Sequence, residues 1–221
     1  MDITLEAANL QQFRYALYQN FNKRADTLLE LLDALCSQPE TRSVVEYSLA
    51  PCYRRSYSTI FKALDELRLS PLWLPLRLAP YLPRPTQRPF WLLIADVTVC
   101  PRPYVVTLKD RGMAYQPEVV KGELPVTIGH QYSTVVLGLE PEAGCSVSWM
   151  VSLLTERVPT TANKELVGAR QIDRLLQAPE LTGTLDRRRG RKIHVAFGED
   201  AISQSQSLGR NLCKHVHNWA A

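Results

Sequence analysis

The chain has 221 residues, of which 45% are hydrophobic, enough to form the core of one large domain or two small ones. Its net charge of +4 permits a polyanionic partner without requiring one. No apolar run approaches the roughly 20 residues of a membrane span, the first six residues include two acids where a signal peptide carries positive charge, and the five cysteines form no Cys-x-x-Cys pair. We therefore expect a cytoplasmic protein without a disulfide framework or zinc knuckle.

Residues 1–70 are predicted to form a helical domain. Closely spaced leucines mark a helix from about Lys23 to Cys36, and a second apolar pattern follows Ser56 or Ser58, either of which can cap a helix. Six cations could supply a basic face, namely Arg14, Lys23, Arg24, Arg54, Arg55 and Lys62. Two interpretations stay open: a DNA-binding domain, and a structural or dimerisation bundle.

Residues 71–89 contain six prolines. Proline lacks the amide proton that a helix or a sheet ladder requires, and its ring fixes φ. The segment is therefore predicted to be an extended connector at a domain boundary.

The pattern changes to strands after Arg88. Apolar and β-branched residues predict three strands, a helix that Asn163 caps, and a last strand. These elements are expected at Phe90–Asp96, Tyr132–Leu139, Cys145–Leu154, Asn163–Gln177 and Lys192–Phe197. The order is that of a ribonuclease H-like core. The predicted fold class is α/β, a helical bundle followed by an incomplete ribonuclease H-like core with the order β-β-β-α-β.

Asp96 directly follows the apolar run 90–95. A carboxylate beside so much apolar surface needs a cation, a proton or several hydrogen-bond donors. A divalent metal is one interpretation, and an Asx-type turn is the other. Parallel pairing of the last predicted strand with the first would bring Glu199 and Asp200 beside Asp96, where acids could share metal ions.

Three blocks of sequence follow one another over about 40 residues. The chain reads Asp96-Val-Thr98-Val-Cys-Pro101-Arg102-Pro103, then Thr107-Leu-Lys-Asp110-Arg111-Gly112, then Gly129-His130-Gln131-Tyr132-Ser133. In these blocks the chain resembles the catalytic domain of DDE-type transposases of bacterial insertion sequences, the group with an Asp-x-Thr-x-x-Pro-Arg-Pro block. The resemblance covers about half of the chain, from Arg88 to past Leu176.

The resemblance implies metal-dependent DNA cleavage and strand transfer in transposition. Asp96 matches the first acid of the family and Asp200 stands for the second, so both are expected to be catalytic and to hold Mg²⁺ or Mn²⁺. Thr98 is expected to support the geometry of Asp96. The implied partner is DNA, both transposon ends and target, in the bacterial cytoplasm and at the nucleoid when DNA-bound. A homo-oligomer is compatible with this role, and a membrane partner is not expected.

Cations are predicted to contact the DNA. Those in the motif blocks are Arg102 and Arg111, and the others form a basic run after the predicted helix, namely Arg187, Arg188, Arg189, Arg191 and Lys192. A solvated surface turn is the alternative for the run. A local ion pair between Asp110 and Arg111 is the alternative for that part of the motif.

The chain departs from the family pattern after residue 198. It reads Gly198-Glu199-Asp200-Ala201, which puts the second acid about one residue out of register and lacks the tyrosine of the family. The third acid is expected on a later helix, and residues 201–221 do not resemble that part. We therefore expect a truncated, catalytically impaired copy with a partial catalytic domain over 90–200 and a divergent tail over 201–221. A noncatalytic DNA-binding or regulatory derivative is the alternative function.

Overall fold

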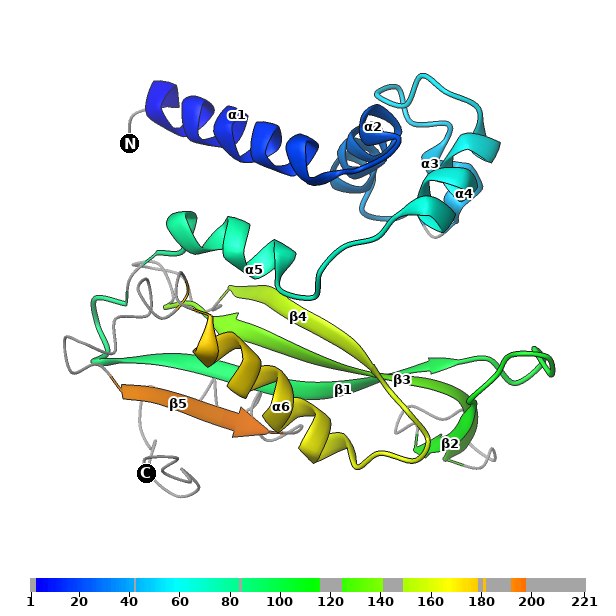
Figure 1. The fold of residues 1–221 in the computed structure, drawn as a ribbon, viewed down its shortest axis with the longest axis vertical. Helices are drawn as coiled ribbons and strands as arrows, with labels where there is room; N and C mark the ends of the chain where they lie inside the picture. Colours follow the sequence, from blue (N-terminus) through cyan, green and yellow to red (C-terminus); the bar gives the residue numbers. More distant parts are fainter. Residues whose placement is uncertain are drawn as a thin grey trace. The chain divides into compact units, whose positions relative to one another are not determined.

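The computed structural model describes residues 3–41, 43–83, 85–115, 125–140, 149–178, 181 and 192–197. The chain divides into two compact units, Met1–Trp73 and Leu74–Ala221. The first unit contains helices and the second contains a mixed sheet (Figure 1). This arrangement confirms the predicted α/β class with helices preceding the sheet.

The first unit contains four helices among its described residues. They are α1 (Ile3–Asn20), α2 (Ala25–Ser37), α3 (Val44–Tyr47) and α4 (Tyr57–Glu66). One core cluster joins α2 and α4 through Leu31, Ala34 and Ile60, and a second joins α1 and α2 through Leu17 and Leu28. The leucine pattern thus predicted α2, and Ser56 occupies the N-cap position of α4.

A helix forms within the segment that the prolines led us to predict as extended. Helix α5 spans Trp73–Leu78, and the 3-10 helix η1 follows at Ala79–Tyr81. Pro75 lies in the first turn of α5 and Pro80 in the first turn of η1. An amide proton in a first turn has no partner within its own helix, so proline is tolerated there. The prediction of an extended connector was therefore wrong over these residues.

The second unit is built on a five-stranded sheet. Its strands are β1 (Phe90–Pro101), β2 (Gly112–Tyr115), β3 (Val126–Gly138), β4 (Met150–Val158) and β5 (Lys192–Phe197). The order is β2-β3-β1-β5, and β4 also pairs with β3. Strand β5 runs parallel to β1, whereas the other pairings are antiparallel. This topology is consistent with a ribonuclease H-like core.

Several strand boundaries differ from the predicted ones. Strand β1 continues past Asp96 to Pro101, because its ladder with β3 runs from Leu92 to Pro101. Strand β2 was not predicted. It pairs with the first residues of β3, on the same side of β3 as β4, which pairs with the later residues of that strand. Strand β4 ends at Val158, later than predicted, and the predicted residues 145–148 lie outside the described residues. Strand β5 has the predicted bounds.

Helix α6 (Lys164–Gln177) covers one face of the sheet, where it contacts β1, β3 and β4 (Figure 1). Asn163 caps it as predicted, since the Asn163 side-chain oxygen accepts hydrogen bonds from the Glu165 and Leu166 amides. Buried side chains of α6 include Val167, Ile172 and Leu175. The position of α6 determines which face of the sheet is left for a site.

Candidate functional site

Asp96 lies on the face of the sheet opposite α6. Ser133 of β3 contacts Gln171 of α6, so its side chain points toward that helix. Asp96 pairs with the next residue of β3, Thr134, and paired residues of antiparallel strands share a face. The side chains of Asp96 and Thr134 therefore point away from α6.

The same alternation places other polar side chains on this face. Thr98 pairs with Tyr132, and Tyr132 pairs with Arg157 of β4. His130 lies one strand repeat beyond Tyr132. We call this surface the Asp96 face and define it by Asp96, Thr98, His130, Tyr132, Thr134 and Arg157. It combines one carboxylate with hydroxyl, imidazole and guanidinium groups.

The carboxylate of Asp96 is half-buried, and only one of its two oxygens is hydrogen-bonded within the described residues. Its Oδ1 atom accepts a hydrogen bond of 2.7 Å from the Val97 amide. Oδ2 makes no hydrogen bond or ion pair with the residues that the structure describes. A carboxylate with an open oxygen fits a hard divalent cation such as Mg²⁺. Within the described ranges, no three His, Cys, Asp or Glu side chains form a metal cluster.

Strand β5 ends beside Asp96. Phe197 pairs with Ala95, and β5 runs in the same direction as β1. The expectation that the last strand would pair in parallel with the first is thus confirmed. Asp200 and Glu199 themselves lie outside the described residues, as do Arg187, Arg188, Arg189 and Arg191, and Lys192 is described only through its backbone.

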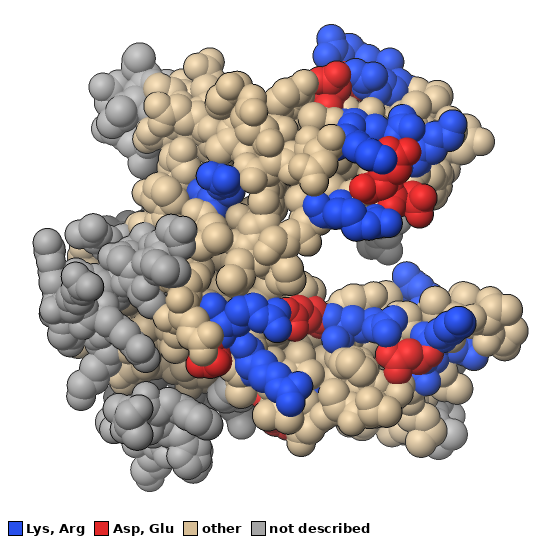
Figure 2. All heavy atoms as spheres, in the orientation of Figure 1, with Lys and Arg blue, Asp and Glu red and all other residues tan. Residues whose placement is uncertain are grey.

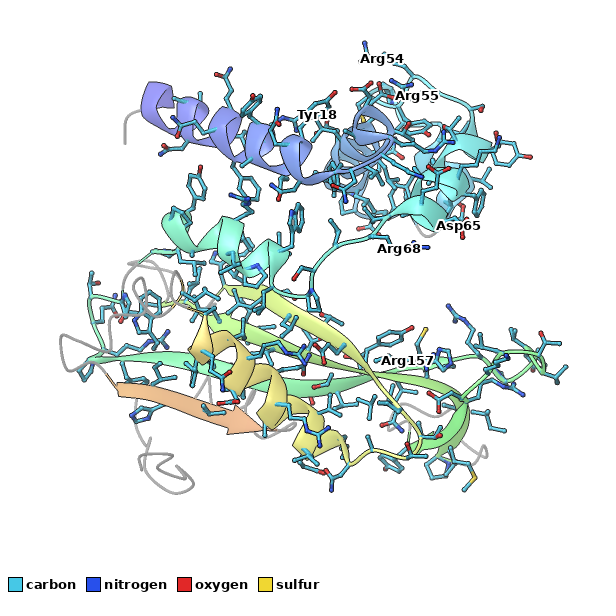
Figure 3. The ribbon with its side chains drawn as sticks, in the orientation of Figure 1. Tyr18, Arg54, Arg55, Asp65, Arg68 and Arg157 are labelled. Carbon is cyan, nitrogen blue, oxygen red and sulfur yellow. The ribbon has the colours of Figure 1, made fainter. Side chains whose placement is uncertain are left out.

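Asp110 forms an ion pair, but not with its sequence neighbour Arg111. Its Oδ2 atom accepts a hydrogen bond of 2.7 Å from Arg157 Nη2, and Oδ1 accepts bonds from the Thr160 hydroxyl and amide. The bonds from Thr160, together with the Arg157 charge, hold the pKa of Asp110 below its usual range. Asp110 therefore pairs with Arg157 of β4, which is 47 residues away in the sequence (Figure 3). The alternative of an ion pair between Asp110 and Arg111 is wrong.

Arg111 binds the loop that precedes it. Its Nη1 atom donates to the carbonyl oxygens of Arg102 and Pro103, at 2.9 and 3.2 Å. Arg102 is exposed, and its backbone amide donates to the Ile128 carbonyl at 2.8 Å. The guanidinium of Arg111 thus has a role within the protein, whereas DNA contacts by Arg102 and Arg111 stay predictions.

A cavity of about 460 Å³ lies at the end of the sheet where α6 begins. Its walls include Gln131, Val158, Thr160 and Lys164. Gln131 neighbours Tyr132 in β3, so their side chains point to opposite faces. Gln131 therefore lines the cavity from the α6 side of β3, and Asp110, which binds Arg157 of the Asp96 face, lines it as well.

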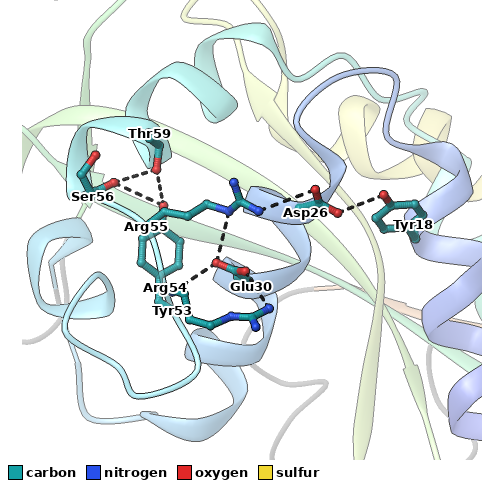
Figure 4. A network of polar contacts seen from close by, with 8 residues as sticks. All are labelled: Tyr18, Asp26, Glu30, Tyr53, Arg54, Arg55, Ser56 and Thr59. Atoms are coloured by element: carbon teal, nitrogen blue, oxygen red, sulfur yellow. Dashed lines mark hydrogen bonds and ion pairs between the residues drawn. The ribbon is translucent and has the colours of Figure 1, made fainter.

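In the helical unit, acids hold the two adjacent arginines that were predicted to be available for a basic face. Glu30 accepts hydrogen bonds from the Arg54 amide and guanidinium, at 3.2 and 3.1 Å, and pairs with Arg55 at 3.3 Å (Figure 4). Asp26 pairs with Arg55 at 3.6 Å and accepts a bond from the Tyr18 hydroxyl.

Two more cations of the predicted basic face are paired. Arg14 binds the carboxylate of Asp33 through Nη1 and Nη2 of its guanidinium, and this contact lowers the pKa of Asp33. Arg24 pairs with Glu66 at 3.1 Å. Cationic and acidic side chains accordingly lie side by side in Figure 2. These pairs support the structural interpretation of the unit, and DNA binding by it stays a prediction.

Sequence reasoning missed Arg157 and Thr134 as members of the Asp96 face. Both lie in strands, and their common face follows only from the register of β3 with β1 and β4. A signal was present in the alternation of β3, where His130 and Tyr132 precede Thr134 at every second position. Arg157 carried no signal, because the predicted third strand ended before it.

Comparison with known proteins identifies the family. A family model described as DDE superfamily endonuclease matches residues 16–198. The match begins within α1, well before the block at Arg88 where the resemblance was seen, so it includes most of the helical unit. No curated protein and no solved structure gives a significant match. Among the described residues, no helix is long and apolar enough to cross a membrane. Because the matching region spans more than four-fifths of the chain, the protein belongs to the DDE superfamily of endonucleases.

Proposed function

We propose that this protein acts in DNA transposition as a metal-dependent DNA endonuclease and strand transferase of the bacterial insertion-sequence type. The observation that carries the proposal is the position of Asp96. It lies on the face of the sheet opposite α6, with one carboxylate oxygen free of described partners, beside the end of the parallel strand β5. A nucleic-acid substrate follows from membership of the family.

Asp200 is the proposed second acid. Three residues of extended chain span at most about 11 Å, so Asp200 stays within that distance of Phe197, which pairs with Ala95. Thr98 lies on the same face as Asp96, one strand repeat away, and is proposed to support the orientation of the carboxylate. The family generally uses a divalent metal, and Asp96 and Asp200 would hold Mg²⁺ or Mn²⁺. Such ions activate the attacking oxygen and neutralise charge on the phosphate.

Positive charge would hold the DNA. Arg102 is exposed just after β1, and the run Arg187–Lys192 leads in the sequence into β5, whose first residue is Lys192. Each phosphate contact by such a cation releases a counterion, so the affinity for DNA should fall as salt is added. The proposed DNA is that of the transposon ends and the target, bound by a homo-oligomer.

A noncatalytic DNA-binding or regulatory role is the second candidate. The observation that favours it is the sequence Gly198-Glu199-Asp200-Ala201, which offsets the second acid and lacks the tyrosine of the family pattern. In this role Asp96 would bind metal weakly, and the cations would still bind DNA.

Nicking of a supercoiled plasmid in Mg²⁺ or Mn²⁺ tests the proposal. Metal-dependent nicking that Asp96→Asn abolishes and Asp173→Asn preserves would support catalysis by this chain. Asp173 is a matched control because it is an exposed acid on α6, on the other side of the sheet. DNA binding that weakens with salt, without nicking, would favour the noncatalytic role. Absence of both nicking and DNA binding would overturn both.

A further inference from the structure

The loop between β1 and β2 exposes apolar side chains at its end. We call residues 102–109 the tip loop; they follow β1 and extend beyond the sheet (Figure 1). Tyr104 is 93% exposed and Val106 is 77% exposed. An aromatic ring so fully in water buries none of its apolar surface within its own fold, and such surface often marks an interaction site.

The tip loop is nevertheless tied together by hydrogen bonds. The guanidinium of Arg111 donates hydrogen bonds to three carbonyl oxygens of the loop, from Nη1 to those of Arg102 and Pro103 and from Nη2 to that of Val106. Backbone bonds from Val105 to Arg102 and from Leu108 to Val105 close turns within it. A loop ordered in this way loses less conformational entropy when it binds a partner.

Side chains of the Asp96 face fasten the base of the loop. The His130 imidazole contacts the Lys109 carbonyl oxygen at 3.0 Å, and Arg157 binds Asp110. Asp110 has a left-handed backbone with φ of 57°, a strained conformation that its bonds to Thr160 and Arg157 maintain. The loop is thus joined to the surface on which DNA would be cleaved.

The charge of the loop indicates the partner. Arg102 and Lys109 are exposed at its two ends, whereas Asp110, the acid beside them, is already bound by Arg157. An exposed aromatic ring between exposed cations fits a nucleic acid, because cations bind phosphates and rings stack on bases.

The distance from Asp96 fits the same partner. Strand β1 continues from Asp96 to Pro101, and at about 3.3 Å per residue this is about 17 Å. Successive nucleotides of B-form DNA rise about 3.4 Å. A strand cut at Asp96 and running along β1 would therefore reach the tip loop about five nucleotides from the cut.

We propose that Tyr104 stacks on an unpaired base of the substrate DNA about five nucleotides from the cleaved bond, while Arg102 and Lys109 bind the neighbouring phosphates. The inference rests on the proposed function, which supplies DNA as the substrate. It goes further by assigning the tip loop to DNA in which bases near the cut are unpaired.

Two fluorescent DNA probes test the assignment by anisotropy: a continuous duplex, and the same duplex with a central stretch of unpaired bases. Stacking on one base is worth about 1–3 kcal/mol, so Tyr104→Ala should weaken binding of the second probe roughly 10- to 100-fold. It should change binding of the duplex less than about two-fold. Tyr104→Phe keeps the ring and should behave as wild type. Tyr115→Ala is the matched control, since Tyr115 is also exposed, at 64%, but lies outside the loop.

The cations should have a different effect. Arg102→Gln and Lys109→Gln should weaken binding of both probes and reduce the slope of log affinity against log salt by about one each. An unchanged unfolding temperature would verify that these exposed substitutions leave the fold intact.

The outcomes separate this inference from the proposed function. If wild type binds both probes and Tyr104→Ala binds them equally well, the tip-loop assignment is overturned and DNA binding stands. If Tyr104→Ala instead changes only the oligomeric state in sedimentation, the loop is a protein interface and the assignment is likewise overturned. If wild type binds neither probe, both the assignment and the proposed function are overturned.

Discussion

Ser133 of β3 and Gln171 of α6 exchange two hydrogen bonds beneath the helix. The Ser133 hydroxyl donates to Gln171 Oε1 at 2.6 Å, and Gln171 Nε2 donates to the Ser133 carbonyl oxygen at 3.0 Å. Gln171 is completely buried and Ser133 is 1% exposed. The pair therefore satisfies polar groups that would be costly to bury alone, and it joins α6 to the face opposite Asp96.

Removal of either partner should leave a buried polar group unsatisfied. We expect Gln171→Met and Ser133→Ala each to lower the free energy of unfolding by about 1–3 kcal/mol. The double variant should lose less than the sum, because it removes both partners of the side-chain bond. Denaturant unfolding measures all three, with Gln177→Met, an exposed change on the same helix, expected within about 0.5 kcal/mol. Additive losses would show that the two side chains are not coupled.

Gly129 is required where β1 and β3 approach closely. A Cβ atom at Gly129 would lie 2.2 Å from the Cys100 carbonyl oxygen, a backbone atom that cannot move away cheaply. We expect Gly129→Ala to destabilise the protein by more than about 2 kcal/mol in thermal or denaturant unfolding.

Gly138, at the other end of the same strand, is a matched control. A Cβ atom there would meet the end of the flexible Leu92 side chain at 3.3 Å. We therefore expect Gly138→Ala to cost less than about 1 kcal/mol. Equal effects at the two glycines would contradict the steric explanation.

The elements that the sequence predicted well are those that local signals determine. Asn163 followed by an amphipathic pattern predicted α6, and the segment Lys192–Phe197 was predicted as a strand with the observed bounds of β5. The length of β1 could not be predicted in the same way. Pro101 and Pro103 indicated a turn soon after Asp96, but β3 pairs with the intervening residues as far as Pro101, so the strand continues.

The surroundings of Asp96 likewise could be predicted only where local sequence determines them. The motif around Asp96 led us to predict one acid of the site, since its neighbours Thr98 and Pro101 lie close in the sequence. The pairings that shape the surroundings join distant residues, such as Asp110 with Arg157 and Glu30 with Arg54. The sequence around a cation does not show the acid that binds it when that acid lies elsewhere in the chain. Such a cation is therefore predicted to be available for DNA although it is already paired.

Glu140 should stabilise the start of β1 in a pH-dependent way. Its carboxylate accepts hydrogen bonds from the amides of Thr86, Gln87 and Arg88. Burial raises the pKa of Glu140, but these bonds outweigh burial and hold the pKa below its usual range. We expect Glu140→Gln to lower the free energy of unfolding by about 1.5–3 kcal/mol at neutral pH.

The sign of the pH effect follows from the lowered pKa. The folded state favours ionised Glu140, so its contribution is complete above the pKa of the unfolded chain, about 4.3, and is lost as the pH falls through the folded pKa. The difference between wild type and Glu140→Gln in urea unfolding should therefore be constant above about pH 5 and shrink below it. Glu165→Gln, an exposed acid of α6, should change stability by no more than about 0.5 kcal/mol. A difference that grows at acidic pH would contradict the assignment.

Glu30 offers a test of the two interpretations of the helical unit. The side chain of Glu30 is 10% exposed and holds Arg54 and Arg55, whereas the Arg54 side chain is 80% exposed. Replacement by glutamine removes the charge and leaves two cations that water can solvate, so we expect Glu30→Gln to cost about 1–2 kcal/mol of unfolding free energy. Asp65→Asn, an exposed acid of the same unit, should cost less than about 0.5 kcal/mol.

DNA affinity measured on the same variants decides between the interpretations. If the unit is structural, Glu30→Gln should bind a DNA duplex within about two-fold of wild type, because the freed arginines do not face the DNA. If Arg54 and Arg55 contact phosphates, loss of the neighbouring negative charge should tighten binding at low salt, and the gain should vanish as the ionic strength rises. Four arginines of this unit, Arg14, Arg24, Arg54 and Arg55, are paired with acids, and this leads us to expect the first result. Salt-sensitive tightening would instead establish the helical unit as a DNA-binding domain.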